Sequence, residues 1–334
     1  MSVIIKEPAL SDQQMVAEAE RALADISKVR GGVGRVIFGQ ESVVERTLVA
    51  LLAGGHALLV GVPGLAKTKL VETLGVVLGL NARRIQFTPD LMPSDILGSE
   101  VMEQDDHGRR SFRFIPGPIF AQLLMADEIN RASPRTQSAL LQSMQEYHVT
   151  VAGARHDLPS PFHVLATQNP LEQEGTYPLP EAQLDRFLMQ IDVPYPEIEA
   201  ERRILLETTG IDDARAENVL TPERLKEIQV LIRRMPVPET VVEAILALVR
   251  SARPGQGSLD IDKHVAWGPG PRASQALTLC ARARALYDGR LAPSIDDVRA
   301  LAEPVLQHRM ALTFAARAEG MSVRDVIQRL VKGV

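Results

Sequence analysis

Apolar residues follow two different spacings along this chain, and the change between them divides it. Up to about residue 193, short apolar runs alternate with stretches of helical spacing, whereas from Glu199 onward nearly every apolar run has helical spacing. The short runs are typical of strands, and they cover residues 57–60, 84–88, 112–115, 123–126, 149–151, 162–167 and 187–193. The pattern therefore predicts an α/β domain followed by a helical domain, with the boundary at Pro194-Tyr195-Pro196.

Stretches of helical spacing separate these runs. Residues 11–29 form one amphipathic helix, and the glycines at positions 31, 32 and 34 are expected to end it. Its apolar stripe consists of Met15, Ala19, Ala22, Leu23 and Ile26. Residues 42–53 also have helical spacing. Ser133 and Pro134 are a strong helix start, with an N-cap hydroxyl and a proline at the first helical position, and they lead into a helix over residues 136–146.

A glycine-rich segment lies between the apolar run 57–60 and the next helix. It reads Gly61-Val62-Pro63-Gly64-Leu65-Ala66-Lys67-Thr68. Such a turn points several backbone N–H groups at one anion, and the following helix adds the positive end of its dipole. We expect Lys67 to contact the β- and γ-phosphates of a nucleoside triphosphate and Thr68 to ligate magnesium. Ala66 stands where glycine is usual, so its φ is expected to stay negative and near-helical.

Two adjacent carboxylates follow the apolar run 123–126. In a parallel sheet ligands gather at the carboxyl ends of the strands, so Asp127 and Glu128 should lie beside the phosphate loop. We expect Asp127 to hold Mg²⁺, usually through water, and Glu128 to orient and polarise the attacking water. The alternative interpretation is a solvated helix N-terminus before Ser133, but a cap needs no buried run in front of it.

Composition and charge limit the possible functions. The chain has 334 residues, 45% of them hydrophobic, which suggests two domains with packed cores. Its net charge is −5, and the arginine pairs at 83–84, 109–110 and 233–234 are expected to be solvated surface. Residues 1–197 carry 17 basic and 24 acidic side chains, and the remainder carries 20 and 18, so neither half predicts a nucleic-acid-binding face.

Few features suggest membrane or metal-cluster chemistry. Cys280 is the single cysteine and is expected to be a small core residue, and the seven histidines form no H-x-x-x-H pair. The most apolar stretch, residues 49–60, is too short to span a bilayer, and the first residues lack the order of a signal peptide. We therefore expect a cytoplasmic protein without a transmembrane segment.

Three further polar residues are candidate site residues because of their order behind the two phosphate motifs. Asn169 follows the apolar run 162–167, where its amide can bridge the γ-phosphate and the attacking water. Arg186 precedes the run 187–193, and Arg272 opens a helix of the second domain. Singly, an asparagine before proline is usually a turn residue and such arginines usually form surface ion pairs.

Taken together, these segments resemble the MoxR-type AAA+ ATPases, and the resemblance runs from about residue 36 to 315. The alanine before Lys67 is itself similar to this family's form of the loop. The stretches that carry the resemblance are residues 61–68, 114–120, 126–132, 137–141, 144–146, 166–170, 180–187 and 304–309.

The resemblance implies a P-loop αβα core with a parallel sheet over residues 31–196, preceded by a helical segment at 1–30 and followed by a smaller all-helical lid at 197–334. It implies an insert in the helix after the second strand, at 98–117, and a hairpin before the sensor strand, at 147–161. Asn169 resembles sensor 1, Arg272 sensor 2, and Arg186 the finger donated to a neighbouring subunit. ATP would lie between core and lid, in a ring that is typically a hexamer. Its expected contacts are Val36, Ile37, Gly39, Gln40, Gly61, Val62, Pro63, Gly64, Leu65, Ala66, Lys67, Thr68, Lys69 and Arg272.

The resemblance also implies a chaperone-like ATPase that remodels protein clients, often with a partner that bears a von Willebrand factor A domain. That domain's Asp-x-Ser-x-Ser motif does not occur in this chain. Catalysis is expected from Glu128, Asn169, Arg186, Arg272 and Lys67. The alternative is an AAA+ nucleic-acid motor or loader. The polar segment 103–110 is expected to be either a solvated loop or a projecting tip that couples nucleotide state to partner contact. The sequence does not reveal the client.

Overall fold

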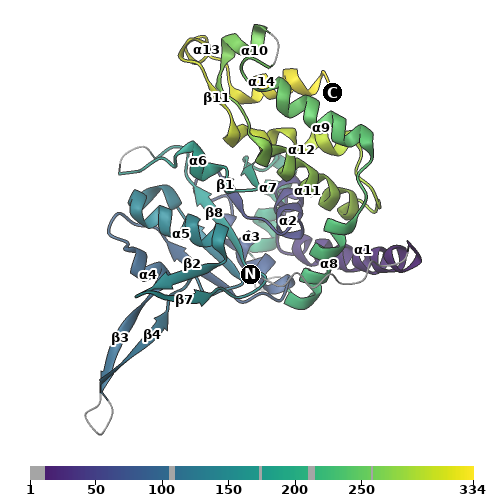
Figure 1. Ribbon diagram of the computed structural model, residues 1–334. Coiled ribbons are helices and arrows are strands. Elements are labelled where there is room, and N and C mark those ends of the chain that lie inside the picture. The colour runs from purple at the N-terminus through teal and green to yellow at the C-terminus, as the bar shows by residue number, and fades with distance from the viewer. Residues whose placement is uncertain (1–11, 105–109, 173–174, 210–214, 257–258) are drawn as a thin grey trace.

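Five parallel strands form the centre of the N-terminal half in this computed structural model (Figure 1). The structure describes residues 12–104, 110–172, 175–209, 215–256 and 259–334. Along the sheet the order is β2 (Ala82–Gln86), β5 (Leu123–Asp127), β8 (His163–Gln168), β1 (Ala57–Val60) and β9 (Met189–Asp192). Because all four neighbouring pairs are parallel, every strand ends at the same edge, where ligands of such sheets bind.

Alternate residues of the strands belong to two separate hydrophobic cores. Leu58 and Leu124 face one core, with Leu140 of α5 (Pro134–Glu146), whereas Leu59 and Leu123 face the other. The second core also contains α2 (Glu41–Leu52) and α3 (Lys67–Val77). This alternation follows from the two-residue period of a strand, and it confirms the three-layer αβα core.

The C-terminal half is a helical lid that packs on the second core. Its helices are α7 (Ile198–Thr208), α8 (Pro222–Arg234), α9 (Glu239–Ser251), α10 (Leu259–His264), α11 (Pro271–Tyr287), α12 (Ile295–Leu306), the 3₁₀ turn η2 (Gln307–Arg309), α13 (Phe314–Ala318) and α14 (Val323–Val331). A short antiparallel pair, β10 (Val265–Trp267) with β11 (Ala311–Leu312), adds to the predicted helices. The predicted division after residue 196 stays a prediction.

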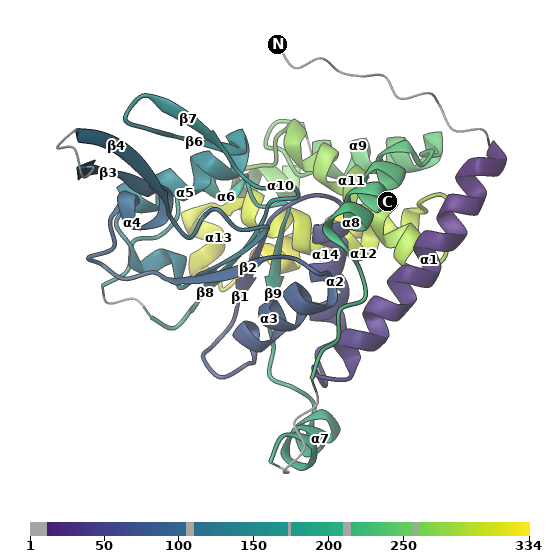
Figure 2. The same cartoon turned by 90° about the horizontal axis from the view of Figure 1, so that it is seen from below.

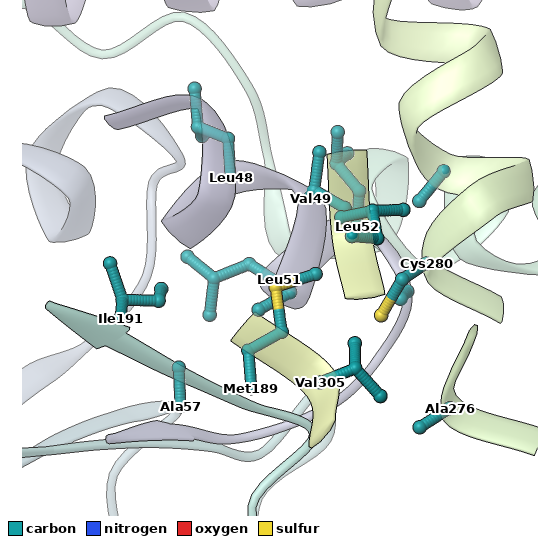
Figure 3. Packing of buried hydrophobic residues seen from close by; sticks show 14 of the residues in the cluster. Leu48, Val49, Leu51, Leu52, Ala57, Met189, Ile191, Ala276, Cys280 and Val305 are labelled. Atoms are coloured by element: carbon teal, nitrogen blue, oxygen red, sulfur yellow. The ribbon is translucent and has the colours of Figure 1, made fainter. Parts of the chain in front are cut away.

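Core and lid share one continuous apolar cluster. Leu51 of α2, Met189 and Ile191 of β9 and Val305 of α12 meet there, with Cys280 of α11 among them (Figure 3). Cys280 is buried, as expected of a small core residue, and burial raises the pKa of its thiol. The shared cluster means that the lid rests on the sheet through a packed interface.

The first helix is longer than its glycines suggested. Helix α1 (Asp12–Gly34) continues through Gly31 and Gly32, so the expected helix end is wrong, whereas the domain boundary after residue 30 stays a prediction. The helix continues because Val29 and Val33 extend its buried stripe. A β-carbon on Gly32 would lie 3.4 Å from a Val77 methyl of α3, which is ordinary van der Waals contact, so α1 packs against α3 at this point. Figure 2 shows α1 along the outer side of the molecule.

Two hairpins project from the core near each other (Figures 1 and 2). After α4 (Pro93–Leu97), β3 (Gly98–Gln104) pairs antiparallel with β4 (Arg110–Pro116), which is the insert expected at residues 98–117. The second hairpin, β6 (His148–Val151) with β7 (Ala154–Asp157), lies where the pre-sensor hairpin was expected. Phe114 stacks on His156 with ring centroids 3.8 Å apart, which joins the two hairpins. Residues 105–109 of the polar segment 103–110 lie outside the described residues.

The remaining elements are short. They are the 3₁₀ turn η1 (Ile129–Arg131) and α6 (Glu181–Leu184). No helix among the described residues is both long and apolar enough to cross a membrane.

Candidate phosphate-binding site

The glycine-rich segment connects the carboxyl end of β1 to the first turn of α3. Gly61 leaves the sheet with its N–H donated to the carbonyl of Gln168 at 3.1 Å. A β-carbon at Gly61 would lie 2.9 Å from the Val193 carbonyl oxygen, so only glycine fits there without a shift. Gly64 has a φ of 85°, which favours glycine for a second reason. The backbone therefore wraps around one point in front of α3, as a phosphate loop does.

Ala66 adopts the left-handed conformation that was not expected of it. Its φ is 54° and its ψ is 22°, at the N-cap of α3. The expectation of a negative φ is therefore wrong: the loop keeps the backbone of the usual glycine although an alanine is present. A left-handed L-residue costs roughly 1–2 kcal/mol, which the surrounding contacts must offset. One such contact is next to Ala66, since Gln40 Nε2 donates to the carbonyl of the preceding residue, Leu65, at 3.0 Å.

Lys67 turns back over the loop from the first position of α3. Its Nζ donates to the carbonyls of Gly61 and Val62 at 2.5 and 2.9 Å. Burial lowers the pKa of this amine, and the nearby carboxylates of Asp127 and Glu128 act in the opposite direction. The amine is thus a cation next to the two acids, in a position where phosphate oxygens could replace its carbonyl partners.

The two carboxylates stand at the carboxyl end of β5. Asp127 is only 8% exposed, and its Oδ1 accepts a bond from the Thr167 hydroxyl at 2.5 Å. Glu128 turns out of the strand with a φ of 55°, and its N–H donates to the same hydroxyl at 2.9 Å. Thr167 therefore ties both acids to β8. A solvated helix cap, the alternative interpretation, does not fit a carboxylate that is buried at a strand end.

Each acid also has a basic or amide partner from a neighbouring segment. Arg84 of β2 donates to Asp127 Oδ2 through Nη2 at 2.5 Å and through Nε at 3.1 Å. Gln86 and Arg131 donate to Glu128 Oε2 at 2.7 and 3.1 Å. The expectation that Arg84 is simply solvated surface is wrong, because β2 lies next to β5 in the sheet and carries this arginine to the site.

One cavity collects most of the expected site residues. Its volume is about 440 Å³. Its lining comprises Pro63, Gly64, Leu65, Ala66, Lys67, Thr68, Lys69, Asp127, Glu128, Thr167 and Asn169. Asn169, at the end of β8, is 5% exposed and accepts the N–H of Leu171 at 3.1 Å. The cavity thus brings a phosphate loop, two acids and a neutral amide to one place.

The donor set of this cavity suits magnesium. The Thr68 hydroxyl and the Asp127 carboxylate are hard oxygen donors of the kind that Mg²⁺ prefers. No group of three His, Cys, Asp or Glu residues that could hold a metal alone occurs in the part of the chain that the structure describes. An ion held here would therefore take its other ligands from phosphate and water, as Mg²⁺ usually does in nucleotide sites.

The first four expected ATP contacts, Val36, Ile37, Gly39 and Gln40, lie between α1 and α2. Val36 and Ile37 are buried, and Gln40 reaches the phosphate loop through the bond to Leu65 described above. Gly39 has a φ of 70°, and a β-carbon there would lie 2.1 Å from the β-carbon of Ala200 in α7. The first lid helix therefore packs directly on this segment, so nucleotide contacts here could be shared between core and lid.

Arg186 and Arg272 lie elsewhere. Both line a second cavity of about 270 Å³, together with Gly55 and His56, which precede β1. The Leu188 N–H bonds to the His56 carbonyl at 2.8 Å, which places this segment at the amino end of the strands. Since β1 has four residues, the two edges of the sheet are about 13 Å apart. The expectation that Arg272 contacts the nucleotide of its own subunit is therefore not supported by this geometry.

The two arginines share an acidic neighbour. Arg272 lies 3.6 Å from Asp185 and is about half exposed. Arg186 donates from Nη1 to the Leu141 carbonyl at 2.6 Å, and its buried Nε has no partner in the described part of the chain. The second cavity thus presents two guanidinium groups with unused donors, although it contains no phosphate loop.

Sequence reasoning missed Thr167, Arg84, Gln86 and Arg131. Thr167 stands within the stretch 166–170, and its place next to Asn169 was an available signal. Arg84 and Gln86 act from β2, and only the neighbouring position of β2 and β5 in the sheet brings them to the acids. Arg131 reaches Glu128 from three positions later in the same turn, so its spacing was also an available signal.

Comparison with known proteins agrees with this geometry. Residues 56–189 match the family model described as ATPase family associated with various cellular activities (AAA), and residues 258–330 match the AAA lid domain. The chain is 46% identical to Chaperone MoxR1 of Mycobacterium tuberculosis over 90% of this chain and 80% of that protein. It is 30% identical to Protein MoxR of Methylorubrum extorquens, over 84% and 85% of the two chains.

A solved structure shows the same fold. It is the crystal structure of a protein from Cytophaga hutchinsonii that was described as a candidate ATPase. The TM-score is 0.88 at 36% identity, over 96% of this chain and 98% of the other.

Proposed function

Because the chain belongs to the MoxR family of AAA+ ATPases, we propose that it hydrolyses ATP at the interfaces of a ring and uses the energy to remodel partner proteins. One observation carries the proposal. The phosphate loop, the paired acids and Asn169 line one cavity, whereas Arg186 and Arg272 lie at the opposite edge of the sheet. This division is what a site completed by a neighbouring subunit requires.

Within one subunit each site residue has its own role in phosphoryl transfer to water. Lys67 binds the β- and γ-phosphates, and the N–H groups of the loop hold the remaining oxygens. Glu128 orients the attacking water and accepts its proton, and Asn169 holds this water in line with the γ-phosphorus. Thr68 and Asp127 would hold Mg²⁺, which neutralises charge on the phosphates when bound.

The arginines complete the site of the neighbouring subunit. Among the described residues the buried Nε of Arg186 has no partner, and Arg272 is exposed in the same cavity, so both guanidinium groups have N–H donors for phosphate oxygens. A guanidinium placed on the transferring group stabilises charge that exists only in the transition state. In this arrangement Arg272, like Arg186, acts on the neighbour's ATP.

A contact between two different edges of the molecule is heterologous, and repetition of it produces a ring when the rotation closes. We propose a hexamer, as the MoxR-type resemblance implies. Because ATP is supplied in the cytoplasm, we propose that the protein acts there.

Protein clients are the proposed substrates, since one relative at 46% identity is named a chaperone. The exposed arms of the β3–β4 hairpin are suitable for such a contact. Met102 and Phe112 face each other across this hairpin and are 53% and 71% exposed. The stack of Phe114 on His156 links it to the β6–β7 hairpin, which precedes β8 and Asn169. A partner with a von Willebrand factor A domain is part of the proposal.

The alternative, a nucleic-acid motor, has less support because neither half of the chain carries a large basic excess. Mobility shift at physiological salt with single- and double-stranded DNA and RNA distinguishes the two. Tight binding that stimulates ATP hydrolysis would favour the motor.

The decisive experiment mixes two inactive variants. Glu128→Gln cannot activate water, and Arg186→Ala cannot supply the finger, so each alone should lose hydrolysis, the second by roughly 10³-fold or more. In an equal mixture, about a quarter of the interfaces join an intact Glu128 to an intact Arg186 of the neighbour. ATP turnover should therefore recover to about a quarter of the parental value.

A matched mixture serves as the control. The double variant, Glu128→Gln with Arg186→Ala, is mixed equally with the parental chain. If Arg186 acts in the neighbour, both mixtures retain about a quarter of the activity. If it acts in its own subunit, the first mixture stays inactive and the second retains about half. That second pattern, in rings that exchange subunits, would refute the proposed site.

A further inference from the structure

One stretch of the family resemblance, residues 304–309, has no part in the ATP site described above. The structure places it against residues 185–190, called here the finger segment because they include Arg186. Gln307 donates from Nε2 to the Gln190 carbonyl at 2.9 Å. His308 donates from Nε2 to the Phe187 carbonyl at 3.0 Å. The turn η2 of the lid thus holds the main chain of the core.

Arg309 makes the largest set of these contacts. Its Nε bonds to Asp185 Oδ1 at 2.7 Å, and its Nη2 bonds to the Phe187 carbonyl at 2.6 Å. Longer bonds run to the Leu188 carbonyl at 3.2 Å and the Asp185 carbonyl at 3.3 Å. The side chain is 3% exposed. A planar guanidinium offers five donors in fixed directions, which a lysine amine cannot reproduce.

Asp185 connects this buried arginine to the exposed one. Its Oδ1 accepts from Arg309, and its Oδ2 lies 3.6 Å from Arg272. Arg186 is the next residue in the chain. Arg309 therefore bonds to the carbonyl before Arg186, that of Asp185, and to the carbonyl after it, that of Phe187. The lid residues Arg272 and Arg309 therefore share the Asp185 carboxylate, and the core residue Arg186 is attached directly to Asp185 in the chain.

We propose that Arg309 is a positioning residue that aims Arg186 and Arg272 at the nucleotide of the neighbouring subunit. The inference rests on the proposed function, in which Arg186 acts across the interface. Its consequence is that lid and finger move together, so a change in the lid of one subunit alters hydrolysis in the next. Arg309 itself lies too deep to touch ATP.

Arg309→Lys tests the role because it keeps the charge and removes the fork. A misplacement of about 1 Å in a catalytic group can cost about 100-fold in rate, so we expect ATP turnover to fall on that order. The affinity of the variant's own phosphate loop for ATP, measured under conditions without turnover, should stay within about twofold of the parental value. A parental turnover rate would overturn the inference.

Mixing with Glu128→Gln separates positioning from a general loss of structure. In the mixture, Glu128→Gln subunits donate a well-placed Arg186 to Arg309→Lys subunits, so turnover should return to about a quarter of parental. Absence of rescue would mean that Arg309 supports its own subunit's site, and would overturn the inference. In the double variant with Arg186→Ala, Arg309→Lys should cause a smaller loss than it causes alone, because one of the two groups that it positions is already gone.

Two further variants keep the test decisive. Asp185→Asn removes the same link and repeats the mixing test if Arg309→Lys does not assemble. Arg290→Lys is the matched control, since Arg290 pairs with Asp297 within the lid and does not contact the finger segment. This variant should lower stability, but it should not show a loss of ATP turnover that mixing with Glu128→Gln restores. If Arg186→Ala is not rescued either, the proposed function fails; if only Arg309→Lys is not rescued, the positioning role alone fails.

Discussion

Acid should destabilise this fold well before its carboxylates titrate, because three histidines are buried in neutral form. His56, His163 and His308 are 5%, 1% and 4% exposed. Burial lowers the pKa of His56 to about 3, with a smaller contribution from His163, and lowers that of His163 to about 4. Burial, followed by the charge of Arg309, lowers the pKa of His308 well below 6.5.

The sign and size of the effect follow from linkage. The unfolded chain binds protons on these histidines below a pKa of about 6.5, and the folded chain does not, so stability falls as the pH falls below 6.5. At pH 5 each buried histidine costs about 2 kcal/mol relative to neutral pH, at 1.36 kcal/mol for each pH unit. Three of them cost about 6 kcal/mol, a large part of a typical stability of 5–15 kcal/mol.

Carboxylates act in a lower pH range. Arg290 and Arg284, together with the Ser294 N–H, hold the pKa of Asp297 below its usual value despite its burial, so its contribution is lost only as the pH falls below about 4. The loss between pH 6.5 and 5 is therefore assigned to histidine.

Urea unfolding of the nucleotide-free chain at pH 7.5 and pH 5.0 measures the difference. His163→Gln should lower stability at pH 7.5, because the bond between its Nδ1 and the Gly55 carbonyl is lost, and should reduce the acid-induced loss by about 2 kcal/mol. A total change below about 1 kcal/mol between the two pH values would refute the reasoning.

Three further outcomes are expected. Lys67→Ala should weaken ATP binding itself, because the amine contacts phosphates in the ground state; an unchanged dissociation constant in equilibrium titration would contradict the phosphate loop. Ala66→Gly should stabilise the chain by up to about 1 kcal/mol in thermal unfolding, since relief of the left-handed strain exceeds the entropy that glycine loses. A loss of stability would contradict that assignment. Asp297→Asn should cost about 3–5 kcal/mol, because Arg284 and Arg290 lose a fully buried partner, and a smaller change in the urea midpoint would show that water replaces it.

The nucleotide chemistry could be predicted because its residues are contiguous in sequence. The glycines, Lys67 and Thr68 follow one strand directly, and Asp127 and Glu128 follow another. Parallel strands end at a common edge, so local order was enough to predict that these groups meet. The strand runs and the helix after Ser133 could be read for the same reason, since hydrophobic period and caps are local properties.

Tertiary packing decided the features that local order does not contain. Gly31 and Gly32 were expected to end a helix, but burial of Val29 and Val33 outweighs the weak helix propensity of glycine. Ala66 takes a positive φ because the loop on both sides is anchored. Propensity costs of about 1 kcal/mol per residue are easily overcome by such contacts.

The position of the arginines depended most on the fold. Arg272 is 86 residues beyond Arg186 in the sequence, and nothing in the pattern indicates that it approaches Asp185, the residue before Arg186. The lid sets this geometry through Arg309, whose partners lie more than 120 residues earlier in the chain. The sequence by itself determined which phosphate chemistry this chain can perform, because those groups are local. Only the packing of lid on sheet decided that its arginines face away from its own phosphate loop, because long-range burial and ion pairing set that orientation.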